Sequence, residues 1–293
     1  MSYLMHIGFD NTSRLCRNVY YFEYKGIRYK LIQNNTRKWQ DVLLTIISGG
    51  NNKKLQDKAY ITASEFLSAL SWENGSRTKL ENIGGFGVYG NCTLKKAKCR
   101  CFSFPEVPFG GNIQGYNISK IPKIETNEQR NALILFREAS SSNNQFLSFL
   151  FYWQVLEIGK KDAVGWINKT YRKNRNGIRL STDEISKLPL NNKKLGNYFL
   201  DDCRNVIAHI VKRKPGLTTI QLDNPDDNLR IKMSTYVIEE FARFYIKSEL
   251  NLTKNMYLVR KNGKGFPVYM DEDDTKKCSC PLAYKDRPQK IRY

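Results

Sequence analysis

The order of apolar and polar positions divides the chain into a first part of mixed texture and a second part that is helical. Residues 19–24 and 27–32 are rich in aromatic and β-branched side chains and flank Lys25-Gly26, which predicts a β-hairpin. Residues 38–48 and 62–72 place apolar side chains at helical spacing, so we expect two helices there. The first part of the chain therefore predicts an α/β domain.

From about residue 125 onward the apolar positions keep a helical period. We expect helices over residues 127–139, 146–158, 163–172, 182–188, 192–212 and 229–250. Helices joined by short polar connections pack into a bundle. Residues 256–259 and 266–270 flank a glycine-containing turn and predict a second hairpin.

These elements predict an α+β fold with three parts. We expect an N-terminal mixed α/β recognition domain over residues 1–120, an all-α helical bundle over residues 121–250, and a short β-hairpin with a basic tail over residues 251–293. Prolines and glycines in residues 105–123 are typical of a connection, which favours a domain boundary in that region.

The amino-acid composition adds information mainly through the net charge of the chain. The 41% of hydrophobic residues and 12% of aromatic residues exclude a wholly disordered chain. The 48 lysines and arginines outnumber the 28 acidic residues and give a formal net charge of +20. Such an excess attracts polyanions, of which nucleic acid is the commonest, although a basic surface also serves solubility.

Two features bear on the compartment. The N-terminal residues lack the basic and apolar regions of a secretory signal, and the longest apolar run, residues 146–156, is too short to span a bilayer. Seven cysteines, an odd number in a chain without a signal, favour reduced thiols. The sequence thus predicts a cytoplasmic protein that does not enter a membrane.

Arg204, Asn205 and His209 are the strongest candidates for chemistry. They lie in the expected helix 192–212, with four residues between the arginine and the histidine. Histidine exchanges a proton near neutral pH, and arginine binds a phosphate that gains negative charge as a reaction proceeds. In a chain of charge +20 this trio suggests a metal-free ribonuclease site.

Residues 125–250 resemble the HEPN superfamily, which comprises compact helical bundles with Arg, four to six residues and then His as their hallmark. Here Arg204 is followed directly by the polar Asn205 and later by His209, in a helix that precedes a long closing helix. Likeness to the subgroup related to methylamine-utilisation J proteins rests on residues 131–137, 146–157 and 204–209.

The resemblance implies a metal-independent endoribonuclease, classed as a hydrolase, whose site forms when two helical bundles dimerise. It implies RNA as the substrate, a homodimer through the bundle, and a role in prokaryotic anti-phage (antiviral) defence or toxin–antitoxin control. A regulatory or antitoxin protein would then be a further partner. Because other members have lost catalysis, the alternative is a non-catalytic RNA- or partner-binding subunit of a larger ribonucleoprotein or defence complex.

In the implied reaction, the ribose 2′-hydroxyl attacks the adjacent phosphorus and leaves a 2′,3′-cyclic phosphate and a 5′-hydroxyl. His209 would be the base or the acid, Arg204 would bind the non-bridging oxygens, and Asn205 would orient the phosphate or the histidine. On an ideal helix, residues five apart differ by about 140° in direction, so Arg204 and His209 do not share one face. The alternative is a helix-surface network in which Asn205 bonds His209 and Arg204 pairs with Asp201 or Asp202.

Basic side chains around the trio are candidates for contacts with the RNA backbone. They are Lys160, Lys161, Arg172, Lys173, Lys212, Arg213 and Lys214. Such residues also form ordinary solvated faces. We expect Trp166, which lies among them, to be buried, and Glu157 to face solvent at the end of its helix.

Four cysteines form two Cys-x-Cys pairs, Cys99 with Cys101 and Cys278 with Cys280, which could supply thiolates to a tetrahedral zinc. Structural zinc more often has two residues between its paired cysteines, so free thiols are the default and we expect no metal and no cofactor. His6 is solitary and is expected to be structural. The sequence contains no motif of a P-loop NTPase, a serine hydrolase with a nucleophile elbow or a zincin.

Overall fold

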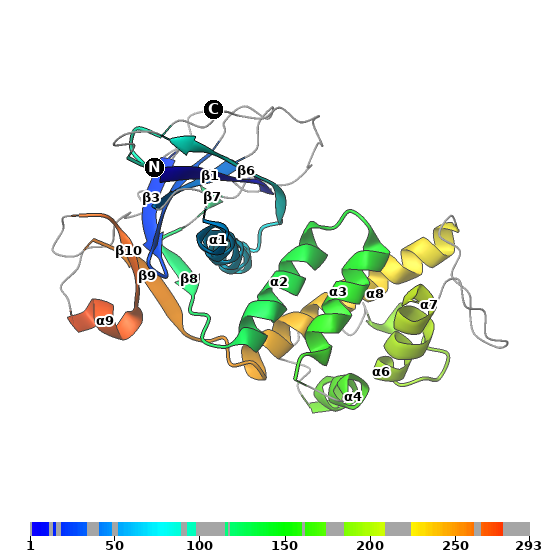
Figure 1. The fold of residues 1–293 in the computed structure, drawn as a ribbon. Coiled ribbons are helices and arrows are strands. Elements are labelled where there is room, and N and C mark those ends of the chain that lie inside the picture. The colour runs from blue at the N-terminus through cyan, green and yellow to red at the C-terminus, as the bar shows by residue number, and fades with distance from the viewer. Residues whose placement is uncertain are drawn as a thin grey trace, which may run out of the picture. The chain divides into compact units, whose positions relative to one another are not determined.

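Two compact units make up the chain in the computed structural model, Met1–Ile124 with Thr253–Tyr293 and Glu125–Leu252 (Figure 1). The structure describes residues 2–11, 14–15, 19–33, 41–48, 52–88, 93–97, 115–116, 118–159, 162–173, 185–208, 224–260 and 265–277. The first unit contains a β-sheet and the second is helical, so the α+β fold class predicted from the sequence is confirmed.

An eight-stranded sheet is formed by the described residues of the first unit. In spatial order its strands are β6 (Thr78–Val88), β1 (Ser2–Asn11), β5 (Asp41–Ser48), β4 (Ile27–Ile32), β3 (Val19–Tyr24), β10 (Val268–Asp271), β9 (Asn255–Val259) and β8 (Lys120–Pro122). Neighbouring strands pair antiparallel, except that β3 and β10 are parallel. Two short strands, β2 (Arg14–Leu15) and β7 (Gly115–Tyr116), form a separate parallel pair.

The hairpin predicted within residues 19–32 is confirmed. Strands β3 and β4 pair antiparallel, and the register runs from Val19 opposite Ile32 to Tyr24 opposite Ile27. Lys25 and Gly26 form the turn with φ angles of 49° and 77°. Two positive φ angles give a tight turn whose twist matches the right-handed twist of the flanking strands.

Residues 38–48 do not form the helix that the sequence predicts. Residues 41–48 are strand β5, and residues 38–40 lie outside the described part. The prediction was wrong because β5 lies between β1 and β4 and buries side chains on both of its faces. A strand of this kind carries a continuous apolar run without an alternating period, and such a run fits a buried helix equally well.

Helix α1 (Lys53–Asn74) contains the helix expected at residues 62–72. It contacts β1 and β5 as well as β6 and β8, the two outermost strands of the sheet (Figure 1). Every residue from Thr62 to Ser71 is buried. Phe66 stacks on Phe22 of β3 with ring centroids 4.4 Å apart, at the centre of the apolar core.

The hairpin predicted near the C-terminus is also confirmed. Strands β9 and β10 pair antiparallel and join the sheet of the first unit, where β10 lies beside β3 and β9 beside β8. Helix α9 (Glu272–Lys277) follows β10. Within the region 105–123, which we interpreted as a connection, residues 115–116 and 120–122 are strands, and residues 105–114 and 117 lie outside the described part.

The second unit is built on α2 (Asn127–Ser141), α3 (Gln145–Glu157), α4 (Ala163–Lys173) and the long α8 (Pro225–Ser248). These helices confirm the predictions at residues 127–139, 146–158, 163–172 and 229–250. Helix α3 packs against both α2 and α8. Of the predicted helix 182–188, only residues 185–188 lie in the described part, and residues 185–186 are helical. Within the described part of the chain, no helix is both long and apolar enough to cross a membrane.

Candidate functional site

The segment that carries Arg204 is not the uniform α-helix predicted for residues 192–212. It consists of α6 (Leu195–Tyr198), a π-helical segment η1 (Phe199–Arg204) and α7 (Asn205–Ala208), while residues 209–212 lie outside the described part. The backbone N–H of Asn205 donates to the carbonyl of Leu200, five residues earlier. Such wide turns are rare and are frequently found at functional sites.

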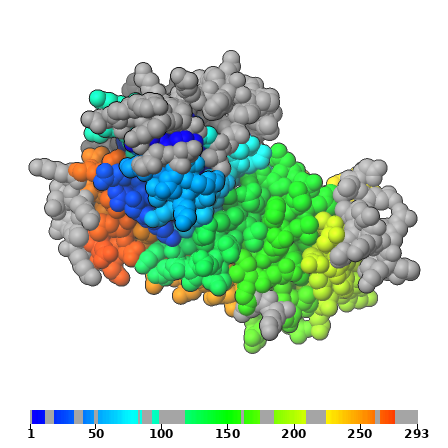
Figure 2. Space-filling view, in the orientation of Figure 1, coloured from blue at the N-terminus to red at the C-terminus, as the bar shows by residue number. Residues whose placement is uncertain are grey.

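Apolar side chains hold this segment against the bundle. Leu195, Tyr198, Phe199, Cys203, Val206 and Ile207 are buried. Phe199 meets Phe149 of α3 edge to face, with ring centroids 5.9 Å apart. In the space-filling view, α3 and the yellow-green residues of this segment form a continuous surface (Figure 2), in agreement with the contacts of α3 with η1 and α7.

Helix α4 supports the start of the segment through a close backbone approach. Asn168 accepts a hydrogen bond from the backbone N–H of Gly196 at 2.9 Å and donates to Asn197 at 3.2 Å. A Cβ atom at residue 196 would lie 2.5 Å from the carbonyl oxygen of Val164, so only glycine fits there without a shift. Arg172 and Lys173 are exposed at the end of this same helix.

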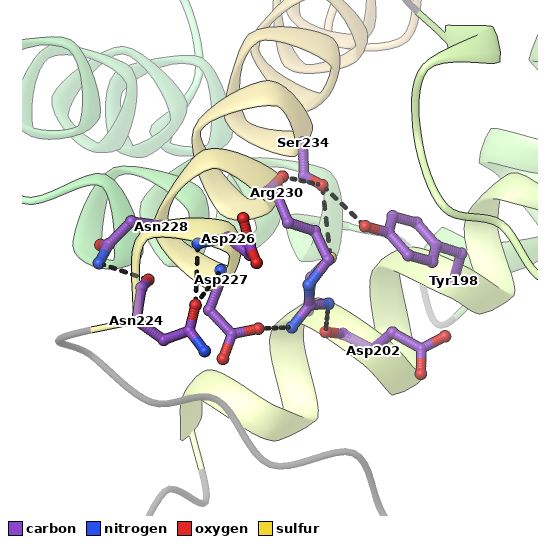
Figure 3. Close-up of polar contacts among 9 residues, drawn as sticks. Tyr198, Asp202, Asn224, Asp226, Asp227, Asn228, Arg230 and Ser234 are labelled. Atoms are coloured by element: carbon purple, nitrogen blue, oxygen red, sulfur yellow. Dashed lines mark hydrogen bonds and ion pairs between the residues drawn. The ribbon is translucent and has the colours of Figure 1, made fainter.

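Arg230 of α8 joins the N-terminal part of α8 to the π-helical segment (Figure 3). Its Nη1 donates to the backbone carbonyl of Asp202 at 2.7 Å, and its Nη2 donates to Oδ1 of Asp227 at 3.1 Å. Burial is the largest single influence and opposes its charged form, but the hydrogen bond with Asp227 and the interactions with Tyr198 and Cys203 together outweigh it, so the pKa of Arg230 is raised. Asn224 caps α8 by accepting from the N–H of Asp226 at 2.8 Å and of Asp227 at 3.4 Å.

A buried hydroxyl cluster lies one helical turn further along α8. Ser234 donates to the carbonyl of Arg230 at 2.9 Å, so its oxygen accepts from the Tyr198 hydroxyl at 3.2 Å and the Cys203 thiol at 3.6 Å. Burial raises the pKa of Cys203 to about 11 and also raises the pKa of Tyr198. Both groups therefore remain protonated donors at neutral pH, which excludes Cys203 as a ready nucleophile.

Arg204 and Asn205 are half-buried at the junction of η1 and α7, and the Arg204 Nη1 donates to the Asn205 Oδ1 at 3.1 Å. The alternative pairing of Arg204 with Asp201 or Asp202 does not occur. Lys193 contacts both carboxylates instead, at 3.9 Å and 2.7 Å, and the hydrogen bond with Asp202 raises the pKa of Lys193. Within the described residues, no carboxylate lies at ion-pair distance from Arg204.

Several predicted residues lie outside the described part of the chain. They are His209 of the proposed trio, the basic residues Lys160, Lys161, Lys212, Arg213 and Lys214, and the cysteines Cys99, Cys101, Cys278 and Cys280. The distance between Arg204 and His209, the alternative bond between Asn205 and His209, and the zinc alternative therefore stay predictions. Among the residues that are described, no group of His, Cys, Asp and Glu is arranged to hold a metal.

The structure describes three further residues whose burial or role was predicted from the sequence. Glu157 is exposed, as expected, and accepts a hydrogen bond from the Trp153 indole at 2.6 Å. Trp166 is half-buried instead of buried, because its ring packs on Tyr245 of α8 while its indole N–H reaches Glu249 at 3.1 Å. His6 is 6% exposed within β1, and burial lowers its pKa, which agrees with a structural role.

Arg230, Asp227 and Ser234 are missing from the sequence predictions, which used only the apolar positions of this helix. Their spacing of three and four residues places them on one side of α8, and this was the available signal. The spacing alone does not reveal that Arg230 reaches a backbone carbonyl of another segment.

Comparison with known protein families finds one match, which covers part of the chain. Residues 132–247 match the family model of methylamine utilization protein MauJ. The matched segment is less than half of the 293 residues and includes positions 204–209. The predicted likeness to methylamine-utilisation J proteins is thereby confirmed for this segment, and HEPN membership stays a prediction. Comparisons with curated proteins and with solved structures returned no match.

Proposed function

We propose that the second unit is a HEPN-type endoribonuclease that cleaves RNA without a metal. One observation carries the proposal: the half-buried Arg204 contacts the Asn205 amide, and no described carboxylate neutralises it. A guanidinium without an ion-pair partner is suited to a phosphate, which it can bind through two parallel hydrogen bonds. The MauJ match spans this position and His209, which adds support.

The proposed chemistry divides the work among the three residues. His209 or its symmetry mate removes the proton of the ribose 2′-hydroxyl, whose oxygen forms a bond to the adjacent phosphorus. The bond from phosphorus to the 5′-oxygen breaks, and that oxygen takes a proton from the other His209 of the dimer, which is protonated and acts as the acid. Arg204 stabilises the charge on the non-bridging oxygens, and Asn205 orients the guanidinium or the phosphate. DNA lacks the 2′-hydroxyl and would not be cut.

A homodimer through the helical unit is part of the proposal, because residues five apart on an ideal helix, such as Arg204 and His209, would not share one face and a second copy can complete the site. Helix α8 offers a surface suited to this contact. Leu229 and Tyr236 are 57% and 53% exposed and lie seven residues apart, which places both on one side of the helix. Exposed apolar side chains at helical spacing are typical of helix–helix interfaces.

The exposed Arg172 and Lys173 at the end of α4 are proposed to contact the RNA backbone. They lie on the helix that supports Gly196, shortly before the π-helical segment. With a net charge of +20, the whole chain attracts RNA as well. A role in prokaryotic defence or toxin–antitoxin control, with a protein that restrains cutting, is proposed on the resemblance alone.

The test is incubation of the full-length protein with labelled single-stranded RNA in EDTA. We expect cleavage that leaves 2′,3′-cyclic phosphate ends and falls by about a thousandfold in Arg204→Ala and in His209→Ala. Arg28→Ala is the matched control, because Arg28 is 64% exposed in the first unit and lies on β4. RNA bound by all four proteins but cut by none would favour the non-catalytic binding module.

A further inference from the structure

The π-helical turn that presents Arg204 needs contacts from outside itself. In η1 the backbone bonds run from a residue to the carbonyl five positions earlier, as from Asn205 to Leu200. These turns are rare because their geometry is poorer than that of an α-helix, so they persist where neighbouring groups stabilise them. The contacts that η1 makes with α8 are therefore the ones that can stabilise it in this form.

The direction of Arg204 and Asn205 depends on this turn. A π turn accommodates one residue more than an α turn, and each residue of an α-helix rotates the chain by about 100°. If η1 returned to α-helical bonding, residues from Asn205 onward would therefore face a direction about 100° away. The pairing between Arg204 and Asn205 and the surface that they present would change together.

Two points on α8 fix η1 in place. Ser234 accepts hydrogen bonds from Tyr198, just before η1, and from Cys203, inside it. Arg230 donates to the carbonyl of Asp202 at 2.7 Å, in the middle of the turn and two residues before Arg204. The Arg230 side chain is only 14% exposed, and Asp227 fixes its second nitrogen (Figure 3). Arg230 thus bridges a carboxylate of its own helix and a backbone oxygen of η1.

We propose that Arg230 is a positioning residue for the nuclease site. It holds η1 in π-helical form through the Asp202 carbonyl and so sets the direction of Arg204 and Asn205. The expected effect of Arg230 on cleavage rests on the proposed function, whereas its expected effect on the backbone of η1 does not. Arg230 acts through the backbone of Asp202, and contact with the substrate is no part of the proposal.

The test compares Arg230→Lys with Arg243→Lys in the full-length protein. Lysine keeps the charge but has one nitrogen, which cannot bond Asp202 and Asp227 in the geometry of the guanidinium. Arg243 is the matched control, because it lies on α8, pairs with Glu239 at 2.9 Å and contacts the ring of Phe136. We expect only Arg230→Lys to raise hydrogen exchange in residues 199–208, by about tenfold. It should also slow single-turnover cleavage by about tenfold to a hundredfold, with RNA affinity little changed.

A double variant separates positioning from general destabilisation. Because Arg230 acts partly through Arg204, adding Arg230→Lys to Arg204→Ala should cause a smaller further loss of cleavage than Arg230→Lys causes in the wild-type protein. Losses that multiply would overturn the proposal, and so would unchanged exchange in residues 199–208 of Arg230→Lys. If Arg230→Lys lowers the unfolding temperature of the whole protein, Asp227→Asn provides the second variant and should produce the same local increase in exchange. A wild-type protein that cuts no RNA would overturn the proposed function instead, and the exchange comparison alone would then decide the role of Arg230.

Discussion

At the scale of single residues, the groups that pair with the neighbouring carboxylates determine which contacts Arg204 makes. Lys193 contacts the carboxylates of Asp201 and Asp202, the nearest acidic groups in the sequence, and Arg230 takes the Asp202 backbone carbonyl. Arg204 is left with the neutral amide of Asn205 among the described residues. A guanidinium in this position keeps its capacity for two parallel hydrogen bonds to an anion.

Substitution of Arg204 by lysine tests whether the shape of the group matters beyond its charge. We expect Arg204→Lys to bind RNA with little change but to cut it about a hundredfold more slowly, because an ammonium cannot contact two phosphate oxygens in the same planar geometry. Single-turnover cleavage at saturating RNA measures this. Cleavage at the wild-type rate would mean that Arg204 contributes only net charge.

Cys203 provides a prediction about pH. Burial raises its pKa from 9.0 to about 11, so the folded protein favours the protonated thiol. The stability contributed by this group is complete below pH 9 and is lost as the pH rises through about 11. At pH 8 we expect alkylation of Cys203 to be much slower in the native protein than in urea, as followed by mass spectrometry of its peptide. Equal rates in the two states would contradict the buried position.

At the scale of elements, side-chain periodicity predicts most helices correctly. It does not reveal the π-helical turn at residues 199–204 or the strand at residues 41–48. The apolar positions of residues 192–212 fit an α-helix, yet residues 199–204 are π-helical, and Arg230 of α8 donates to the Asp202 carbonyl within them. The run at 38–48 fits a helix too, but residues 41–48 form a strand between two others. In both cases the deciding hydrogen-bond partners lie far away in the sequence.

Gly196 tests the contact between α4 and α6. Because a Cβ atom at this position would lie 2.5 Å from the backbone carbonyl of Val164, we expect Gly196→Ala to destabilise the protein by about 1–3 kcal/mol. Urea unfolding measures the change. Asn197→Ala is the neighbouring control, since Asn197 is exposed and loses one hydrogen bond at 3.2 Å. A Gly196→Ala variant as stable as the wild type would show that the two helices can separate at no cost.

At the scale of the whole molecule, the chain returns to its first unit after completing the second. Strands β9 and β10 come from the end of the sequence and lie between β3 and β8, which come from its first part. The helical unit is continuous from Glu125 to Leu252. Strands β9 and β10 of the C-terminal hairpin are therefore a structural part of the sheet, and the sequence predicts the hairpin without indicating this.

Truncation after Leu252 tests this arrangement. We expect the truncated chain to keep hydrogen-exchange protection in α3 and α8 and to lose it in β3 and β8, because both strands lose a neighbour in the sheet. The full-length chain is the reference. Protection that remains unchanged in β3 and β8 would mean that β9 and β10 contribute little to the stability of the sheet.

The sequence by itself determined the mixed fold class, both hairpins and the main helices, and it proposed Arg204 and Asn205 as site candidates, because turn chemistry, helical period and residue type are local properties. Only the tertiary structure decided that residues 41–48 are a strand and that the last hairpin completes the first sheet. It also placed the Arg230 guanidinium on the backbone carbonyl of Asp202, two residues before Arg204. These outcomes depend on pairing between distant segments, where each buried backbone or charged group must find a partner that local sequence does not specify.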